Sequence, residues 1–331
     1  ASKESPMEKH IYAASYAKKQ ASPRRLDDAP GWHDAQASTS GDYILDAYSA
    51  AETPYIARIA ASSGKWEQNI LTAADPLKDF QRPQIRQVTL KAEDGTPLYG
   101  KLILPVNFDT AGKYPVIVYL YNGPNVQLIR NTYPFSGNLW YEYMAQHGYV
   151  IFTMDGRGSD NRGMAFEQAT FRQLGTVEMN EQLKGVDYLK SLPFIDQHKM
   201  GVHGWSFGGF MTTSLMLRHP GVFQVAVAGG PVIDWSMYEV MYTERYMDTP
   251  QENPEGYATA NLLTKTKNLK GRLLLIHGTN DNVVVWQNSI DFLKACVDNE
   301  VQVDYFVYPG HLHNVLGNDR VQLMQKITDY F

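Results

Sequence analysis

Cysteine is almost absent from this sequence: Cys296 is the single one among 331 residues. One cysteine excludes a disulfide within the chain, and we expect it to pack as a small apolar side chain. No run of about 18 apolar residues occurs, which excludes a membrane-spanning helix of the usual length. There is no excess of basic residues either, because the formal net charge is -5, and this argues against nucleic-acid binding. The hydrophobic content of 44% is enough for a sizeable core.

Glycine and serine come together in one informative segment, Gly204-Trp205-Ser206-Phe207-Gly208. The apolar run Lys199 to Gly204 before it is typical of a buried strand, and Phe207 to Leu217 after it is typical of a helix. A serine on a tight strand-to-helix turn is pushed toward substrate, and small flanking residues let the backbone bend that sharply. The segment therefore predicts the nucleophile elbow of an α/β-hydrolase. The alternative is a glycine-rich turn whose serine caps a helix.

Two further catalytic residue types follow in the order that this fold requires, Ser then Asp then His. Asp281 lies just after the apolar strand Arg272 to Ile276. The strand Val303 to Tyr308 is followed by His311 and His313, so the base has two candidates. Function in open α/β sheets gathers at the carboxyl ends of strands. A metal site at the two histidines is the weaker interpretation, since cysteine and carboxylate ligands are missing nearby, and we expect no metal or cofactor.

The chemistry gives each residue a role. The Ser206 hydroxyl is a poor nucleophile until a base takes its proton. A histidine titrates near neutral pH, so it can act as that base and later as the acid. Asp281 would hold the imidazole in the right tautomer and stabilise its cation.

Several longer motifs resemble the prolyl oligopeptidase family, in the branch of dipeptidyl peptidase IV and the bacterial prolyl tripeptidyl aminopeptidases. The motifs that carry the resemblance are Gly204 to Gly209, Asp155 to Ser159, Tyr242 to Met247 and His277 to Thr279. The resemblance runs from about Gln84 to Phe331. It selects His313 over His311, because the family places its histidine five residues after the tyrosine that corresponds to Tyr308.

The resemblance also implies an oxyanion site. A strand from Val116 is expected to end at Tyr121, before a glycine-proline turn. The family holds the developing oxyanion with this tyrosine and with the backbone amide of the residue after the serine, here Phe207. The alternative for Tyr121 is an ordinary half-buried strand tyrosine.

An aromatic stripe indicates which kind of substrate side chain the site would bind. Trp235, Tyr238 and Tyr242 are spaced by three and four residues, so one helical face is expected to carry all three rings. Periodicity alone favours a core stripe. The resemblance instead implies a pocket for the residue before the scissile bond, and an aromatic box suits proline, which is compact and has no N–H to satisfy. The expected substrate-binding residues are Val232, Trp235, Tyr238, Glu239, Tyr242 and Val284.

Glu239 and Val283 bear on the length of the released peptide. A free amino end is a cation that calls for a carboxylate partner, and the tripeptidyl enzymes have a glutamate matching Glu239. The dipeptidyl enzymes have a substrate-binding asparagine where this chain has Val283. Both features favour a serine exopeptidase that releases tripeptides after proline. Dipeptide release, an esterase or acyl hydrolase on the same fold, a non-catalytic scaffold, and Glu239 as a plain surface carboxylate stay open.

The first 80 or so residues differ from the rest. Lys9 to Ala14, Tyr43 to Tyr48 and Pro54 to Ile59 are short strand-like runs separated by turns, which is typical of a sandwich or propeller. The family carries a β-propeller before its hydrolase domain. We therefore expect residues 1–80 to be the C-terminal part of a propeller, in a chain cut from a longer protein, with a linker at Asp75 to Phe80.

Residues 81–331 are expected to form the peptidase domain. Strands and helices alternate there after a hairpin at Glu93-Asp94-Gly95, which predicts a doubly wound, mostly parallel sheet covered on both faces. Helices are expected at Val177 to Leu192, Gln287 to Val297 and Arg320 to Phe331, and strands at Tyr149 to Asp155 and Val225 to Gly230. The resemblance implies peptide substrates with a free amino end, a homodimer, and a periplasmic, cell-surface or secreted location.

Overall fold

The computed structural model describes residues 4–15, 22–64 and 67–331 and divides into two compact units. The smaller unit comprises residues Ala1–Ile85 and Ile129–Glu142. The larger unit comprises Arg86–Leu128 and Tyr143–Phe331. No helix in the described ranges has the length and apolar character needed to cross a membrane.

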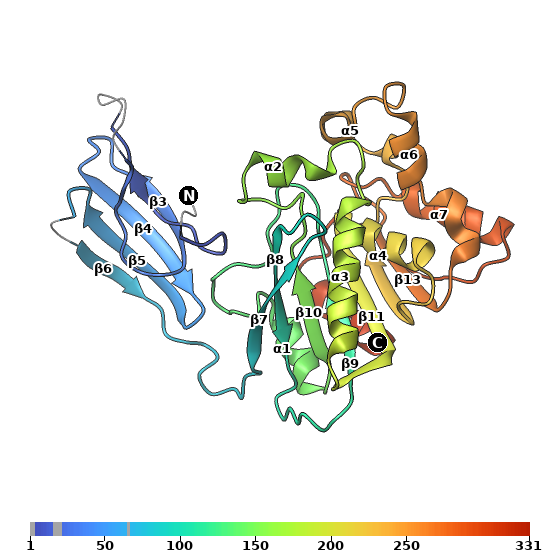
Figure 1. The fold of residues 1–331 in the computed structure, drawn as a ribbon, viewed down its shortest axis with the longest axis horizontal. Helices are drawn as coiled ribbons and strands as arrows, with labels where there is room; N and C mark the ends of the chain where they lie inside the picture. Colours follow the sequence, from blue (N-terminus) through green and yellow to red (C-terminus); the bar gives the residue numbers. More distant parts are fainter. Residues whose placement is uncertain (1–3, 16–21, 65–66) are drawn as a thin grey trace. The chain divides into compact units, whose positions relative to one another are not determined.

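The larger unit is built on a mixed sheet of eight strands in the order β14-β13-β12-β11-β9-β10-β8-β7 (Figure 1). The strands are β7 (Ile85–Lys91), β8 (Pro97–Ile103), β9 (Tyr114–Tyr119), β10 (Val150–Met154), β11 (Ile195–Trp205), β12 (Val225–Gly229), β13 (Arg272–Gly278) and β14 (Asp304–Tyr308). From β9 onward all neighbours are parallel, whereas β8 runs antiparallel to β10. Every residue of β10 is buried, as expected of a parallel strand covered on both faces. The predicted α/β-hydrolase fold is confirmed.

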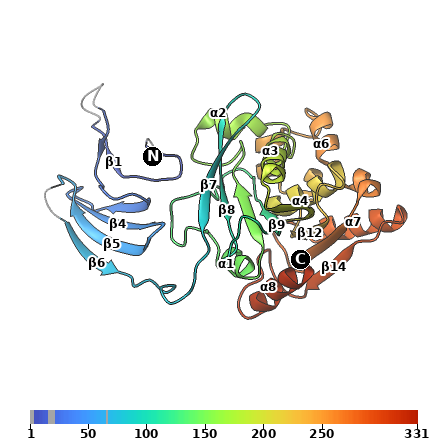
Figure 2. The same ribbon diagram turned by 60° about the horizontal axis from the view of Figure 1, so that its bottom comes forward.

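Helices lie in the crossovers that parallel strands need, and one more helix follows the last strand, β14. They are α1 (Leu139–Gln146), α2 (Met164–Glu167), α3 (Val177–Ser191), α4 (Phe207–Arg218), α5 (Val240–Met247), α6 (Pro254–Ala260), α7 (Gln287–Asp298) and α8 (Asp319–Tyr330), with 3₁₀ turns η1 (Gln168–Thr170), η2 (Trp235–Met237) and η3 (Leu263–Asn268). Helices α3 and α4 cover one face of the sheet and α8 lies on the other (Figures 1 and 2). Successive side chains of β11 therefore lie on opposite faces of the sheet. Val202 packs in the core, whereas the ring of the next residue, His203, lies 6.5 Å from the ring of Phe331.

The chain order of the strands fixes where a site can form. The sheet grows from β9 to β10 in one direction and then crosses to β11 on the other side of β9. Such a reversal opens a crevice at the carboxyl ends of the strands. The serine follows β11, the aspartate follows β13 and the histidine follows β14, so all three lie at this edge.

Two local expectations were wrong. The stripe of three rings does not lie on one helix: the chain forms η2, passes through an extended Tyr238 and then starts α5. The reason is capping, because the carboxylates of Asp234 and Glu239 each accept an amide hydrogen bond and begin a new element. Strand β9 also ends earlier than expected, at Tyr119 rather than Tyr121.

The smaller unit contains a four-stranded antiparallel sheet in the order β3-β4-β5-β6. Its strands are β3 (Trp32–Ala37), β4 (Tyr43–Ala50), β5 (Thr53–Ala61) and β6 (Glu67–Thr72), beside a two-stranded ribbon of β1 (Tyr12–Ala13) and β2 (Arg24–Arg25). A meander of four strands is the pattern of one propeller blade. The expected strands Tyr43 to Tyr48 and Pro54 to Ile59 correspond to β4 and β5, whereas the one expected at Lys9 to Ala14 is only the two residues of β1. Strands β3 and β6 carry too many polar residues to be predicted from alternation.

A segment distant in sequence completes the smaller unit. Asn131 accepts a hydrogen bond from the amide of Ala51 at 2.9 Å and donates to Glu8 at 2.8 Å. Its own amide donates to the carbonyl of Met7 at 2.7 Å. These contacts join residues 80 and more positions apart, so local sequence patterns contain no sign of them.

Cys296 behaves as expected. It is buried on α7, and burial raises the pKa of its thiol to about 11. A thiol with a raised pKa is a weak nucleophile and packs as an apolar group.

Candidate active site

Ser206 sits on a strained turn between β11 and α4. Its backbone has φ 62° and ψ -120°, a conformation that non-glycine residues rarely adopt. Its amide donates to the carbonyl of Gly229 at 2.8 Å. A Cβ at Gly204 would lie 2.4 Å from the carbonyl oxygen of Gly208, and one at Gly208 would lie 2.4 Å from that of Leu120. Both glycines are therefore needed for the turn to fit against the sheet.

Tyr121 lies beside the serine, two residues after β9. Its side chain is hydrogen-bonded to Ser206; burial raises the pKa of the Tyr121 phenol, and this hydrogen bond lowers it in part. The Phe207 ring lies 6.1 Å from the Tyr121 ring. Gly123 permits this approach, since a Cβ there would be 2.6 Å from the tyrosine ring and 2.7 Å from the phenylalanine ring.

Asp281 is buried at 7% exposure and accepts several hydrogen bonds. One oxygen accepts the amides of Val283 and Val284, each at 2.9 Å. The other lies 2.7 Å from Nδ1 of His313 and 3.2 Å from Nε2 of His277. Burial alone would raise the pKa of Asp281, but the hydrogen bonds from His277 and His313 hold it far below its usual range. The carboxylate stays ionised at neutral pH.

In the loop after β14, the two candidate histidines have different partners. His313 faces Asp281, whereas His311 pairs with the exposed Asp319 at 2.7 Å. The backbone carbonyl of His313 accepts a hydrogen bond from the Trp205 indole at 3.0 Å. A Cβ at Gly230 would lie 3.2 Å from the His313 ring, so this glycine leaves room for the imidazole. The geometry therefore favours His313, on a loop tied directly to the residue before the serine.

Aromatic rings form a cluster around Phe207. Its ring lies 5.5 Å from that of Trp235, which stacks on Tyr242 at 6.1 Å and meets Tyr238 edge-on at 5.4 Å. Burial raises the pKa of Tyr238 to about 12, with smaller contributions from Tyr121, Glu239 and Asp281. The cluster thus lies close to the serine and the aspartate, although its members come from separate elements.

The other expected substrate-binding residues differ in exposure. Val232 is 1% exposed and Val284 is fully buried, so the side chain of Val284 offers no surface to a ligand in this conformation. Glu239 is exposed, and its carboxylate accepts the amide of Met241 at 3.1 Å as the N-cap of α5. Val283 is 40% exposed beside the aspartate.

Sequence reasoning missed the part that His277 plays. This histidine is the last residue but one of β13 and is fully buried; its Nδ1 lies 2.7 Å from the Ser289 hydroxyl, and its Nε2 lies 2.9 Å from the carbonyl of Val284. A neutral ring with its proton on Nε2 satisfies all of these contacts, with Ser289 donating to Nδ1. The N–H then points to both the Val284 carbonyl and Asp281. The sequence feature that could have pointed to this role of His277 is the His277-Gly278-Thr279 motif.

A protein-family comparison decides the family. The model described as "Prolyl oligopeptidase family" matches residues 135–331, more than half of the chain. This chain belongs to the prolyl oligopeptidase family. A second model, the dipeptidyl peptidase IV N-terminal region, matches residues 1–55. The two matches confirm the predicted combination of a hydrolase fold with a propeller-type N-terminal region.

Relatives within the prolyl oligopeptidase family have dipeptidyl peptidase names. Mouse dipeptidyl peptidase 8 is 32% identical over 327 residues, covering 95% of this chain and 36% of the relative. A solved candidate dipeptidyl aminopeptidase IV from Bacteroides ovatus is 52% identical with a TM-score of 0.88, covering 90% of this chain and 42% of that one. Porphyromonas gingivalis dipeptidyl peptidase 4 is 30% identical with a TM-score of 0.92, covering 100% and 47%. The chain therefore spans less than half the length of these prolyl oligopeptidase family members.

Proposed function

We propose that this chain is the catalytic part of a serine peptidase that removes short peptides from free amino ends by cutting after proline. The observation that carries the proposal is the 2.7 Å contact between His313 and the ionised Asp281, beside a serine held on a strained elbow. Membership of the prolyl oligopeptidase family and the aromatic cluster support it.

The proposed reaction is acyl transfer. With Nδ1 bound to Asp281, His313 would use Nε2 to take the proton of Ser206 as the hydroxyl oxygen attacks the carbonyl carbon of proline. Tyr121 and the amide of Phe207 would stabilise the oxyanion of the tetrahedral intermediate. The imidazolium would then protonate the leaving amine, giving an acyl-enzyme. Attack by water, with His313 again as base, would release the peptide.

The aromatic cluster is the proposed proline site. The half-buried Tyr238 and Tyr242 would present rings to a side chain that has no polar group to satisfy, and the buried Trp235 packs against both. Val232 lies beneath them in the core, and Val284 supports the aspartate loop through its backbone. The chemistry that we propose uses side chains of this chain and no cofactor.

The release length has two candidates. The names of the relatives favour dipeptides. The exposed carboxylate of Glu239, next to Tyr238 in the aromatic cluster, favours an ammonium contact and tripeptides. We keep residues 1–80 as the end of a β-propeller and 81–331 as the catalytic domain as part of this proposal, together with a homodimer.

The test uses the full-length protein with two peptides that have free amino ends, one with proline second and the other with proline third. Mass spectrometry identifies the released fragment. We expect release from at least one peptide and loss of turnover by more than about 10³-fold in Ser206→Ala. Ser214→Ala, which changes a buried serine of α4, is the matched control and should retain activity.

Either of two outcomes would contradict the proposal. Ser206→Ala retaining a rate within about tenfold of the unmodified enzyme would exclude the serine as nucleophile. Cleavage of neither peptide, with rapid hydrolysis of short acyl esters, would make the protein an esterase. Release of a tripeptide together with its loss in Glu239→Gln would assign the ammonium contact to Glu239.

A further inference from the structure

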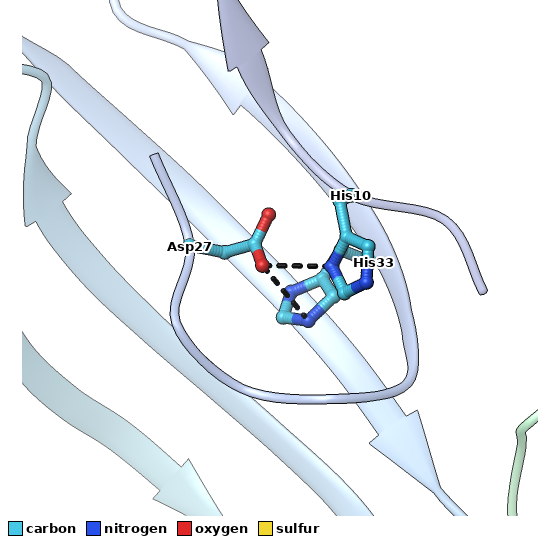
Figure 3. A group of neighbouring side chains, drawn as sticks. All are labelled: His10, Asp27 and His33. Atoms are coloured by element: carbon cyan, nitrogen blue, oxygen red, sulfur yellow. Dashed lines mark hydrogen bonds and ion pairs between the residues drawn. The ribbon is translucent and has the colours of Figure 1, made fainter. Parts of the chain in front are cut away.

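Three buried metal-ligating side chains converge in the smaller unit. Figure 3 shows His10, Asp27 and His33 pointing toward one another. One oxygen of Asp27 lies 2.8 Å from Nδ1 of His10 and 3.8 Å from Nε2 of His33. The three ligand atoms lie within 4.8 Å of one another, and all three side chains have 0% exposure. Within the described ranges, this is the group that meets the geometry of a metal site.

The outward-facing nitrogen of each ring contacts a carboxylate. His10 Nε2 lies 3.0 Å from Glu8, and His33 Nδ1 lies 2.9 Å from one oxygen of Asp46 and 3.0 Å from the other. Histidines that bind metals usually donate their second ring N–H to such a carboxylate, which fixes the tautomer and turns the other nitrogen to the ion. Both histidines here have this arrangement, with their remaining nitrogens facing Asp27.

The inward nitrogens of the two rings both face oxygen atoms. That of His10 faces Asp27, and that of His33 faces the Ala29 carbonyl at 3.1 Å. The ring centroids lie 5.5 Å apart. This spacing lets one ion reach both inward nitrogens and the Asp27 oxygen.

We propose that His10, Asp27 and His33 bind one Zn²⁺ ion that fastens the β1–β2 ribbon to the propeller-type sheet. Two imidazoles and a carboxylate are ligands that zinc prefers. Zinc bonds of about 2.0–2.1 Å in a tetrahedron place ligand atoms about 3.4 Å apart. The observed 2.8 and 3.8 Å separations lie on either side of that distance. The Ala29 carbonyl borders the same space and is a fourth ligand candidate.

The position of the cluster points to a structural role. His10 precedes β1, Asp27 follows β2 and His33 lies in β3, so one ion would join three separate segments. Asp46 of β4 holds the outward nitrogen of His33. Complete burial of the ligands is typical of closed structural zinc sites rather than catalytic ones.

Arg25 is the competing partner of Asp27. Its guanidinium lies 2.7 Å from the same carboxylate oxygen, and the amide of Ile11 donates to the other oxygen. Asp27 is therefore not left uncompensated when zinc is removed. We expect the metal-free protein to stay folded at room temperature, with a lower melting temperature.

The test starts with the unmodified full-length protein, purified without a metal-affinity step, stripped with chelator and dialysed against zinc chloride. Elemental analysis is expected to give about one zinc per chain, bound tightly enough to survive gel filtration. Zinc, but not magnesium, should restore the melting temperature of the stripped protein. Less than about a tenth of an equivalent of zinc, with no shift in melting temperature, would overturn the proposal.

Substitutions of the proposed ligands test where the zinc ion binds. Asp27→Asn and His33→Gln should each lose the bound zinc, while His198→Gln, which changes an exposed histidine of β11, should keep it. Zinc retained in both cluster variants would place the ion elsewhere and exclude this site. The measurement on the unmodified protein decides the question even if a variant does not fold. Peptidase activity through Ser206 is not needed for any of these readouts.

Discussion

At the scale of single residues, the site is held together by hydrogen bonds to Asp281. Two backbone amides fix one of its oxygens, and two histidines face the other. These donors more than offset the effect of burial, so the pKa of this carboxyl is well below its ordinary value. An ionised Asp281 can therefore orient His313 and stabilise its cation throughout the neutral range.

Tyr121 gives the first residue-scale prediction. Replacing it with phenylalanine removes a hydroxyl that is hydrogen-bonded to Ser206 while keeping the ring contact with Phe207. We expect kcat to fall by about 10²–10³-fold with little change in KM, because an oxyanion donor acts mainly in the transition state. Steady-state kinetics on a prolyl peptide measure this. Tyr143→Phe, at an exposed tyrosine, is the control, and an unchanged kcat in Tyr121→Phe would exclude the oxyanion role.

At the scale of elements, two helices have unusual residues at their N-terminal ends. Helix α4 begins at the strained Ser206, and the glycines that flank this residue allow the helix to approach the sheet. The second residue of helix α3 is Glu178, which is fully buried and accepts the amide of Gly175 at 3.0 Å. Its other oxygen has no hydrogen-bond partner, and burial raises the pKa of Glu178 to about 8.

Glu178 predicts a dependence of stability on pH. Its pKa rises from 4.5 to about 8 on folding, so its contribution to stability is fully present below pH 4.5 and is lost as the pH rises toward 8. We expect Glu178→Gln to gain melting temperature relative to the unmodified protein as pH increases from about 5 to about 8. Differential scanning fluorimetry across this range measures the difference. Glu255→Gln, at an exposed carboxyl of α6, should show no such trend; a pH-independent offset in Glu178→Gln would contradict the mechanism.

At the scale of the whole molecule, the two units differ in how their strands are buried. Strand β10 is buried at every residue and lies inside the eight-stranded sheet. Strand β6 is exposed at every residue and lies at the edge of the four-stranded sheet. Backbone hydrogen bonds open more readily where little apolar surface is buried.

Hydrogen–deuterium exchange of the 331-residue chain should follow this difference. We expect peptides from β10, β11 and β12 to exchange slowest, and peptides from β6 to exchange at least about tenfold faster. Mass spectrometry after pepsin digestion resolves these segments. Equal protection of β6 and β10 would mean that the smaller unit is as stable as the sheet of the larger one.

The sequence by itself determined the elements of the larger unit and the residues of the elbow. Buried parallel strands are continuous apolar runs, and helices α3, α4, α7 and α8 end within a residue or two of the predicted bounds, because local patterning decides both. The order of serine, aspartate and histidine is likewise read directly from the sequence. The preference for His313 came from the resemblance, and the structure adds its contact with Asp281.

The tertiary structure decided everything that depends on groups distant along the chain. Asn131 reaches Glu8 across 123 positions, and Asp27 joins His10 and His33 through strand pairing, so neither has a local signature. His313 reaches Asp281 across 32 positions only because β13 and β14 lie side by side and end at one edge of the sheet. The break between η2 and α5 is local by contrast, because Asp234 and Glu239 each accept the amide two residues later and begin a new element. Local sequence sets propensity and burial pattern, whereas side-chain partners are set by which strand ends the fold brings together.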